Sequence, residues 1–411
     1  MKLANEGIST KRVLFWSTAG SIAAAASSLL LLMIVTRVMG AEASGNYSIG
    51  YSIAQLMWTI GVFEETTYFA TDARGRFTSE QYFAFKILST ALMAVVSVVY
   101  TLSFGYPAEK CVLTLWLCAF RGVDAFGLYY YAAFQKAGRL DLSGFYSTWE
   151  MVLSTVAFGV VLVLTRDVVL AVIVATVVEA LWIAVYNNVR LRAVAPIQGP
   201  DFSPAAMRSL LVELLPLFLS SFVQIYLSNI PKYAIDAICA PEVQTLYNVI
   251  FMPSFVINLF MLFVMRPLLT PLSESWLKGE VTEFRRIIRK LVLAVAGMTV
   301  VVIGGAALLG VPVLELVFSI DLKGSLPALL VVLLGGGIAS AANVLYYAIV
   351  ILRRQRAILL AYVAAVASAT LAATPLVSAY GLLGAGMTYC VSVLALLVVY
   401  AIVYLLGVRG K

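Results

Sequence analysis

The stretch SSFVQIYLSNIPKYAIDAICAPE (Ser220–Glu242) determines how the rest of the chain should be interpreted. It is long and apolar enough to cross a membrane, since about 20 apolar residues span the hydrocarbon core. At helical spacing, however, Asn229, Lys232 and Asp236 share one face. A charge inside a bilayer costs roughly 2.5–3.5 kcal/mol on insertion scales, so such residues line a cavity or pair with one another. The stretch therefore predicts a membrane helix whose polar face either lines a cavity or carries a Lys232–Asp236 pair.

The composition of the 411-residue chain predicts an all-α polytopic membrane protein. Hydrophobic residues make up 62% of the sequence and charged residues 12%, whereas soluble domains carry about 25% charged residues. The chain contains no histidine, which excludes histidine-based acid–base catalysis and histidine metal sites. Its four cysteines show no CxxC spacing, so a disulfide framework is not expected either. We expect no catalytic residues, no metal site and no cofactor.

Apolar runs of about 20 residues predict about twelve transmembrane helices along the chain. They are expected near residues 12–38, 44–70, 82–105, 110–135, 141–165, 168–190, 208–239, 243–273, 286–313, 325–351, 357–379 and 382–407. The longest polar joint lies near residues 190–208 and is rich in proline. It divides the chain into an expected N-terminal lobe, residues 1–198, and an expected C-terminal lobe, residues 199–411.

Lysine and arginine gather on one side of the expected spans. Cytoplasmic loops of membrane proteins carry an excess of these residues. If the N-terminus is cytoplasmic, most of the 28 basic residues fall on inner segments. The pattern predicts a multi-pass protein of the cytoplasmic (inner) cell membrane, with both termini in the cytoplasm. The formal net charge of +7 is then a topology signal, and no nucleic-acid partner is expected.

Two pairs of segments repeat at an offset of about 200 residues. AEASGNYSIGYSI (Ala41–Ile53) resembles PEVQTLYNVIFMP (Pro241–Pro253), and the segment from Thr78 resembles the segment from Val281. Six helices return the chain to its starting side, so the two halves would be parallel repeats about an axis along the membrane normal. This pattern predicts two six-helix lobes around a central cavity, the architecture of an alternating-access transporter.

Three runs carry a resemblance to a known family. They are TRVMGAEASGNYSIGYSIAQLMWTIGVF (Thr36–Phe63), NIPKYAID (Asn229–Asp236) and LYNVIFMPSFVINLFMLFVMRPL (Leu246–Leu268). These runs resemble the Wzx-type polysaccharide and O-antigen flippases of the multidrug/oligosaccharidyl-lipid/polysaccharide (MOP) exporter superfamily, which includes the MATE transporters. The resemblance implies a MATE-like V of two six-helix lobes. It also implies a polyprenyl-diphosphate-linked oligosaccharide as the substrate, moved from the inner to the outer leaflet.

Basic residues within or beside the spans are candidates for binding an anionic headgroup. Arg121 lies about 16 Å along the fourth expected helix, near the membrane midplane, with Asp124 one turn further on. The pair is either a structural clamp or a site where the guanidinium holds a diphosphate. Arg266 either snorkels to the headgroups or lines the inner mouth of the cavity. The candidate substrate-binding residues are Arg37, Arg121, Asn229, Lys232 and Arg266.

Carboxylates within the spans are candidates for ion coupling. Glu150 and Glu179 lie near mid-membrane on the fifth and sixth expected helices, with no basic residue at i±3 or i±4. A carboxylate without a partner in a low-dielectric interior tends to hold a proton. Together with Asp124 and Asp236 they are candidates for coupling to a proton or sodium. Alternatively, they are neutral hydrogen-bonding groups or partners of Arg121.

The leading functional hypothesis is a transporter that flips a lipid-linked oligosaccharide across the lipid bilayer for surface polysaccharide biosynthesis. The alternative is a MATE-type multidrug or organic-cation antiporter. In the superfamily that this sequence resembles, such antiporters favour acidic cavity residues, and the proton-coupled antiporters usually carry an acidic residue on the first helix. The first expected helix here, residues 12–38, contains no acidic residue. A membrane enzyme such as a polysaccharide polymerase is disfavoured, because the outer connections are short and histidine is absent.

Overall fold

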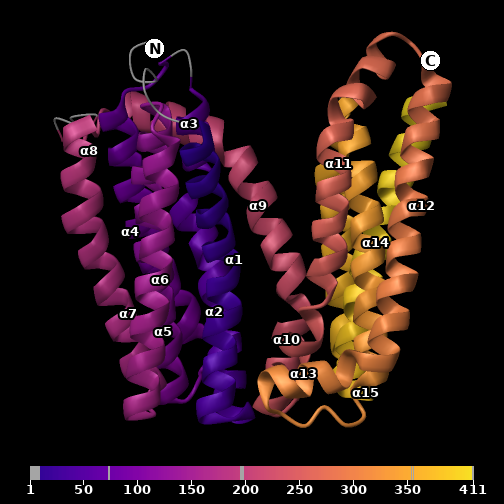
Figure 1. Cartoon of the computed structure of the whole chain (residues 1–411), viewed down its shortest axis with the longest axis horizontal. Coiled ribbons are helices and arrows are strands. Elements are labelled where there is room, and N and C mark those ends of the chain that lie inside the picture. The colour runs from indigo at the N-terminus through magenta and orange to yellow at the C-terminus, as the bar shows by residue number, and fades with distance from the viewer. Residues whose placement is uncertain (1–9, 73–74, 195–198, 353, 355, 410–411) are drawn as a thin grey trace. The chain divides into compact units, whose positions relative to one another are not determined.

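The computed structural model describes residues 10–72, 75–194, 199–352, 354 and 356–409, and throughout this part the chain is helical without β-strands (Figure 1). Nine helical segments of the described part are long and apolar enough to cross a membrane. The chain is therefore a multi-pass membrane protein. It divides into two compact units, Met1–Phe222 and Val223–Lys411. The lobe boundary at residues 198 and 199 remains a prediction.

Unit 1 is built around one central helix, α5 (Ala108–Lys136), which packs against α2, α4, α6 and α7. The other helices of the unit are α1 (Thr10–Met39), α2 (Ala41–Val62), α3 (Glu65–Thr71), α4 (Ser79–Ser103), α6 (Leu140–Thr165), α7 (Val168–Trp182), the π-helical turn η1 (Ile183–Asn187), α8 (Asn188–Val194) and the first part of α9 (Pro204–Ile238). Capping residues determine where some of these helices begin. Thr78 and Gln81 form a reciprocal capping box at α4.

The second expected helix is interrupted, because Phe63 and Glu64 both adopt left-handed backbone conformations between α2 and α3. The break leaves carbonyls at the end of α2 without helical partners. The Lys86 ammonium on α4 donates to two of them, Gly61 O at 3.2 Å and Val62 O at 3.4 Å. It also pairs with Glu65 at 3.0 Å, and both side chains are fully buried. Glu65 is therefore buried although it stands at the start of a helix.

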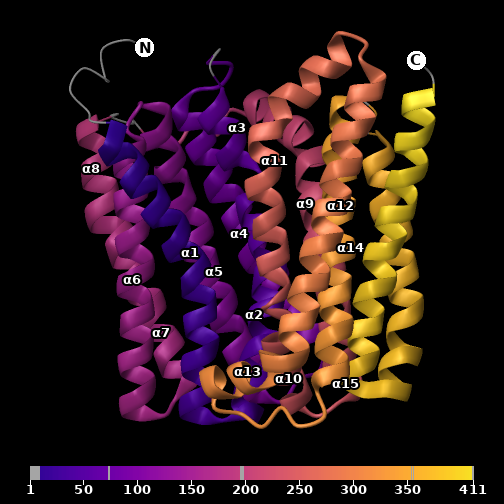
Figure 2. The same cartoon turned by 45° about the vertical axis from the view of Figure 1, so that its right-hand side comes forward.

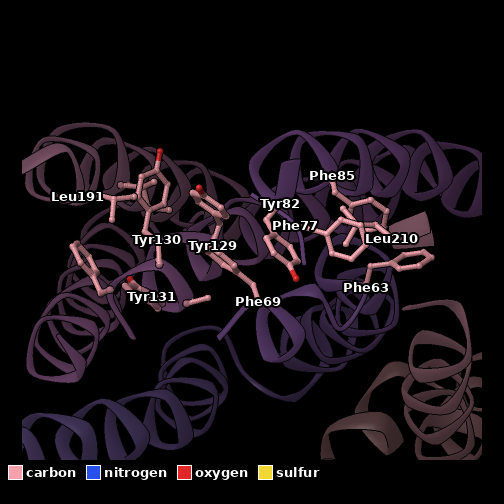
Figure 3. Packing of buried hydrophobic residues seen from close by; sticks show 14 of the residues in the cluster. Phe63, Phe69, Phe77, Tyr82, Phe85, Tyr129, Tyr130, Tyr131, Leu191 and Leu210 are labelled. Carbon is pink, nitrogen blue, oxygen red and sulfur yellow. The ribbon is translucent and has the colours of Figure 1, made fainter. Parts of the chain in front are cut away.

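An aromatic core fills one end of unit 1. Figure 3 shows Phe69, Tyr82, Tyr129 and Tyr130 among its members, with rings from α3, α4 and α5 meeting one another. The Phe69 and Tyr129 rings stack with centroids 5.5 Å apart. The first part of α9 joins this core, where Phe218 stacks on Phe63 at 4.3 Å. Aromatic packing thus fixes the ends of α3, α4, α5 and α9 together.

Unit 2 is built around α14 (Leu326–Ile351), which packs against α10, α11, α12 and α15 (Figure 2). Its helices are the remainder of α9, α10 (Pro241–Phe251), α11 (Ser254–Leu277), α12 (Val281–Gly305), the π-helical turn η2 (Ala306–Gly310), α13 (Val311–Phe318), α14 and α15 (Arg356–Arg409). The repeat found in the sequence matches these starts. The helices α2 and α10 begin at its first pair of segments, and α4 and α12 begin at its second.

The last two expected helices are the two arms of α15. Gly381 has φ 53° and ψ −123°, outside the helical region, so the chain bends there. The bend brings the arms so close that a Cβ at Gly384 would collide with the carbonyl oxygen of Leu376. Glycine is therefore required at Gly384 for steric reasons. The break falls in the expected gap between residues 379 and 382.

Candidate functional site

One face of α5 directs ionisable and aromatic side chains into the interior of unit 1. Asp124 and Tyr131 lie seven residues apart, and Gly127 falls between them on the same face. All three are buried. A Cβ at Gly127 would lie 2.8 Å from Ile183 Cδ1 and 3.3 Å from Glu150 Oε1. The absence of a side chain at this position allows α6 and η1 to close on α5.

Three carboxylates meet beside this face. Asp124 on α5, Glu150 on α6 and Glu179 on α7 each offer a carboxylate oxygen, and these oxygens lie within 4.8 Å of one another. Glu150 and Glu179 are fully buried and Asp124 is 4% exposed. The sequence predicted that each of them lies inside the membrane. It did not predict that they share one site, which we call the carboxylate cluster.

Two neutral side chains complete the carboxylate cluster. The Tyr131 hydroxyl donates a hydrogen bond to Glu150 Oε2, and Asn187 Nδ2 donates to the same oxygen at 3.4 Å. Asn187 ends the π-helical turn η1 and is fully buried. Such turns are frequent at functional sites, because the wider turn re-aims the side chains that follow. Asn187 is not predictable from the sequence, because nothing in an apolar helix marks a π turn.

Several buried oxygens of the carboxylate cluster have no hydrogen-bond donor among the described residues. They are Glu150 Oε1, both carboxylate oxygens of Glu179, and Asn187 Oδ1. Leaving a buried polar atom without a partner costs about 1–3 kcal/mol, and more for a charged group. Oxygen atoms that converge without donors suit a proton or a hard cation such as sodium. The cluster can therefore take up positive charge.

Arg121 borders the cluster. Its Nη1 lies 2.9 Å from Asp124 Oδ2. The guanidinium carbon also lies 4.8 Å from the Trp58 ring centroid and 5.8 Å from that of Tyr51, within cation–π range. One carboxylate and two rings on α2 thus hold Arg121 in place, while its Nε has no hydrogen-bond partner in the described part. With one guanidinium and three carboxylates, the site has an excess of negative charge when ionised.

The polar face of α9 belongs to unit 2. Leu227 and Ile230 pack against α15 through Ala365 and Ala369. At 100° per residue, the candidates on this helix lie on roughly the opposite face. They are Asn229, which is buried, and Lys232 and Asp236, which are partly exposed. The helix is continuous through these positions.

The remaining candidates lie elsewhere. Arg37 is exposed in the last turn of α1. Arg266 belongs to α11, but its side chain lies outside the described residues. The structure therefore brings together Arg121, Asp124 and the two glutamates. The binding and coupling roles of all these residues stay predictions.

Solved structures that resemble this chain include a lipid II flippase and MATE transporters. The lipid II flippase MurJ, in an inward closed conformation, aligns with a TM-score of 0.67 at 11% identity, over 95% of this chain and 90% of that chain. An inward-facing multidrug-resistance MATE transporter of the MOP superfamily aligns with a TM-score of 0.64 at 12% identity, over 98% and 95%. The Vibrio cholerae MATE transporter VcmN, in its bent form, gives 0.56 at 15% identity, over 97% of both chains.

No family model and no curated protein matches the sequence. The likeness therefore establishes the fold. The expected fold class is confirmed: the chain is an all-α polytopic membrane protein with a MATE-like fold. The similar structures named above are transporters and a flippase, not enzymes.

Proposed function

We propose that the chain is an ion-coupled transporter that flips a polyprenyl-diphosphate-linked oligosaccharide from the inner to the outer leaflet by alternating access. The observation that carries this proposal is the buried carboxylate cluster, with its converging oxygens that lack donors. A fold alone does not require such a cluster. Burying several like charges is costly unless they are neutralised. A site of this kind is suited to exchanging protons or sodium during a transport cycle.

In this mechanism the carboxylate cluster alternates between a loaded and an empty form. When Glu150 and Glu179 hold a proton or sodium, their mutual repulsion is removed and α6 and α7 pack closely on α5. When the cation leaves, repulsion between the carboxylates favours a different packing of the same helices. A ligand shifts a conformational equilibrium only through its different affinity for the two states. The cation provides that difference here, because the loaded form carries less net negative charge than the empty form.

Two features support a lipid-linked anionic substrate. One of the similar structures is a flippase for lipid II, a lipid-linked substrate. The chain also places basic residues within or beside its spans, and guanidinium and ammonium groups suit a diphosphate. We assign headgroup binding to Arg37, Arg121, Asn229, Lys232 and Arg266, and coupling to Asp124, Glu150, Glu179 and Asp236.

The second candidate function is a multidrug or organic-cation antiporter. The acidic carboxylate cluster favours it, because a cationic drug could use the same negative charge. Two of the similar structures named above are also MATE transporters. The absence of acidic residues from the first span, residues 12–38, and the basic residues within or beside other spans argue for the flippase.

The test uses purified protein in proteoliposomes with a fluorescent polyprenyl-diphosphate oligosaccharide. Flipping is read from the accessibility of the sugar on the outer face, with and without an imposed proton or sodium gradient. We expect the gradient to accelerate flipping by the unaltered protein. Glu150→Gln and Glu179→Gln should reduce that acceleration at least about tenfold, which corresponds to ~1.4 kcal/mol. Glu42→Gln, which changes an exposed carboxylate on α2, is the matched control and should leave it unchanged.

Two outcomes would overturn parts of the proposal. Uptake of ethidium without flipping of the oligosaccharide would favour the antiporter. A full gradient response in both glutamine variants would remove the coupling role of the carboxylate cluster. Headgroup binding is tested separately by Lys232→Ala in a strain that lacks the gene. Unchanged export of surface polysaccharide by this variant would contradict the anion role of Lys232.

A further inference from the structure

A groove in unit 1 takes no part in the proposed coupling site. Its volume is about 630 Å³, within the ~300–1,000 Å³ typical of ligand sites. Residues of α5 from Leu115 to Tyr130 line it, and so do residues of α4 and of the continuous segment α7–η1–α8. Because α4 and α7 each pack against α5, α5 forms the floor of the groove and the other two segments form its walls.

The groove is apolar and its depth comes from small side chains. They are Ala94, Ala119, Gly122, Ala180 and Ala184. On the walls, the large apolar residues next to these positions are exposed, as Val95, Leu181 and Val185 show. In a membrane-spanning unit, such residues face the hydrocarbon of the bilayer. The groove therefore suits a hydrocarbon chain that enters sideways from the lipid.

The length of the groove distinguishes between kinds of hydrocarbon chain. Leu115 and Tyr130 lie about 22 Å apart along α5, at 1.5 Å per residue. One leaflet contributes only about 15 Å of hydrocarbon, half of the ~30 Å core. A groove of this length crosses the midplane. An ordinary acyl chain, held at the surface of one leaflet, would not fill it. A polyisoprenoid chain, which is much longer, would.

One end of the groove carries a positive charge. Tyr130 and Asn188 line this end. Arg192 follows Asn188 by four residues on α8, so it lies one turn further along the same helix face. Arg192 is exposed, and its charge lies within electrostatic range of the Tyr130 side chain. A phosphate at the end of a chain in the groove would meet this guanidinium.

We propose that this groove binds the polyprenyl chain of the lipid-linked substrate, with the phosphate end of the chain directed toward Arg192. The inference rests on the proposed function, because it specifies where the tail of that substrate lies. The apolar lining, the length beyond one leaflet and the basic residue near the Tyr130 end together favour an anionic polyisoprenoid over a bilayer phospholipid.

The groove and the carboxylate cluster share the turn η1. Ile183 and Ala184 line the groove, while Asn187, at the end of the same turn, donates to Glu150. Gly127 lies next to both Ile183 and Glu150, so that a Cβ at this position would contact both side chains. A chain in the groove therefore packs directly against the turn that positions Asn187. This arrangement links tail binding to the coupling site.

The test is photo-crosslinking of the full chain in phosphatidylcholine nanodiscs with a diazirine-bearing polyprenyl phosphate that has no sugar. We expect labelled peptides from α4, α5 and η1. Gly122→Leu should reduce labelling at least about tenfold, because its side chain would occupy the groove. Gly122→Ala should retain labelling, since its Cβ would meet only Met93, at 3.8 Å. Gly297→Leu is the matched control on α12, where a Cβ would meet nothing within 4 Å.

A second variant covers the case in which Gly122→Leu does not fold. Ala94→Leu fills the groove from the exposed wall on α4, and it should also lose labelling while keeping the thermal unfolding temperature of the unaltered protein. Unlabelled polyprenyl phosphate should compete, whereas farnesyl phosphate and phosphatidylglycerol should compete weakly. Equal competition by phosphatidylglycerol would overturn the proposal, because the groove would then be a bilayer-lipid site.

The probe carries no oligosaccharide, so this result is independent of transport. If flipping fails in proteoliposomes while the groove is labelled as expected, the proposed function is wrong and the chain site stands. If flipping succeeds but labelling falls outside α4, α5 and η1 or resists Gly122→Leu and Ala94→Leu, the chain site is wrong and the function stands.

Discussion

The central helices of the two units differ in what they bury. In unit 1, α5 carries Asp124 into a site with Glu150 and Glu179. In unit 2, α14 buries the neutral Ser340, and its partly buried Asn343 Nδ2 donates to Asn258 Oδ1 at 3.2 Å. These are the fourth helices of the two sequence repeats, and each forms the centre of its unit. A central helix of this fold can therefore be packed without charge.

The contrast extends through both units. The buried charged side chains among the described residues all lie in unit 1, namely Glu65, Lys86, Asp124, Asp141, Glu150 and Glu179. Unit 2 instead uses close packing at Gly335–Gly337, where added Cβ atoms would press on Tyr389, Ser254 and Thr299. These distances make the glycine run a close helix contact. We infer that the buried charges of unit 1 either take part in function or stabilise a locally strained backbone.

Breaking the Lys86–Glu65 pair should give the largest change in stability, and so it best tests the contrast between the buried charges of unit 1 and the neutral groups of unit 2. Both side chains are fully buried, and Lys86 also satisfies carbonyls at the end of α2. Removing one partner of a buried pair costs about 3–5 kcal/mol, because the other charge remains without compensation. We expect Lys86→Met to lower the free energy of unfolding by this amount, measured by denaturation in mixed micelles.

The neutral pair of unit 2 is the comparison. Asn343→Ala should cost only about 1 kcal/mol, the usual net value of a hydrogen bond. The double variant Lys86→Met/Glu65→Met should recover much of the loss, because no buried charge is left unpaired. Equal effects of Lys86→Met and Asn343→Ala would show that the buried charge adds nothing beyond an ordinary polar contact.

Removing a charge from the carboxylate cluster should stabilise the protein, whereas removing one from the Lys86–Glu65 pair should destabilise it. Glu179 has two buried oxygens without donors and like-charged neighbours within 4.8 Å. Glu179→Gln removes that repulsion, so we expect it to raise the stability of the sodium-free protein by about 0.5–2 kcal/mol while coupling is lost. The thermal unfolding temperature, measured with and without sodium, checks this. A lower unfolding temperature in Glu179→Gln would indicate a structural role for this carboxylate.

Much of the fold follows directly from the sequence. Apolar runs of spanning length predicted the regions of the long helices, and the repeat predicted that α2 and α10 start at equivalent places. The expected helix 243–273 is divided into α10 and α11, and α13 lies mostly outside the expected spans. The sequence could not predict the break at Phe63 and Glu64, because their left-handed backbone depends on support from Lys86 in another helix. Tertiary contacts override local pattern at that point.

The site was only partly predictable for a similar reason. Helical spacing placed Arg121 and Asp124 on one face, and an apolar context marked Glu150 and Glu179 as unusual. Their meeting depends on how α6 and α7 rotate against α5, which the π turn and Gly127 determine. Sequence periodicity gives the face of each helix but not the register between helices. Asn187 was missed because its neighbours resemble any other helix end.

The smallest expected effect on stability concerns two loop carboxylates, Asp72 of unit 1 and Asp321 of unit 2. Burial acts to raise the pKa of Asp72, but hydrogen bonds from the Arg76 and Phe77 amides and the Tyr82 hydroxyl outweigh it, so the pKa is lowered. The pKa of Asp321 is lowered chiefly by the backbone N–H of Lys323, in a fully solvated turn.

A lowered folded-state pKa contributes stability above the unfolded value, about 3.9 for aspartate, and that contribution is lost as the pH falls through the folded value. Asp72→Asn should therefore lower the unfolding temperature near about pH 6 and converge with the unaltered protein below about pH 3. Asp321→Asn should change little at either pH, because solvent screens its contacts. Matching pH profiles for both variants would show that Asp72, like Asp321, acts as an ordinary surface carboxylate despite its place in the packed end of unit 1.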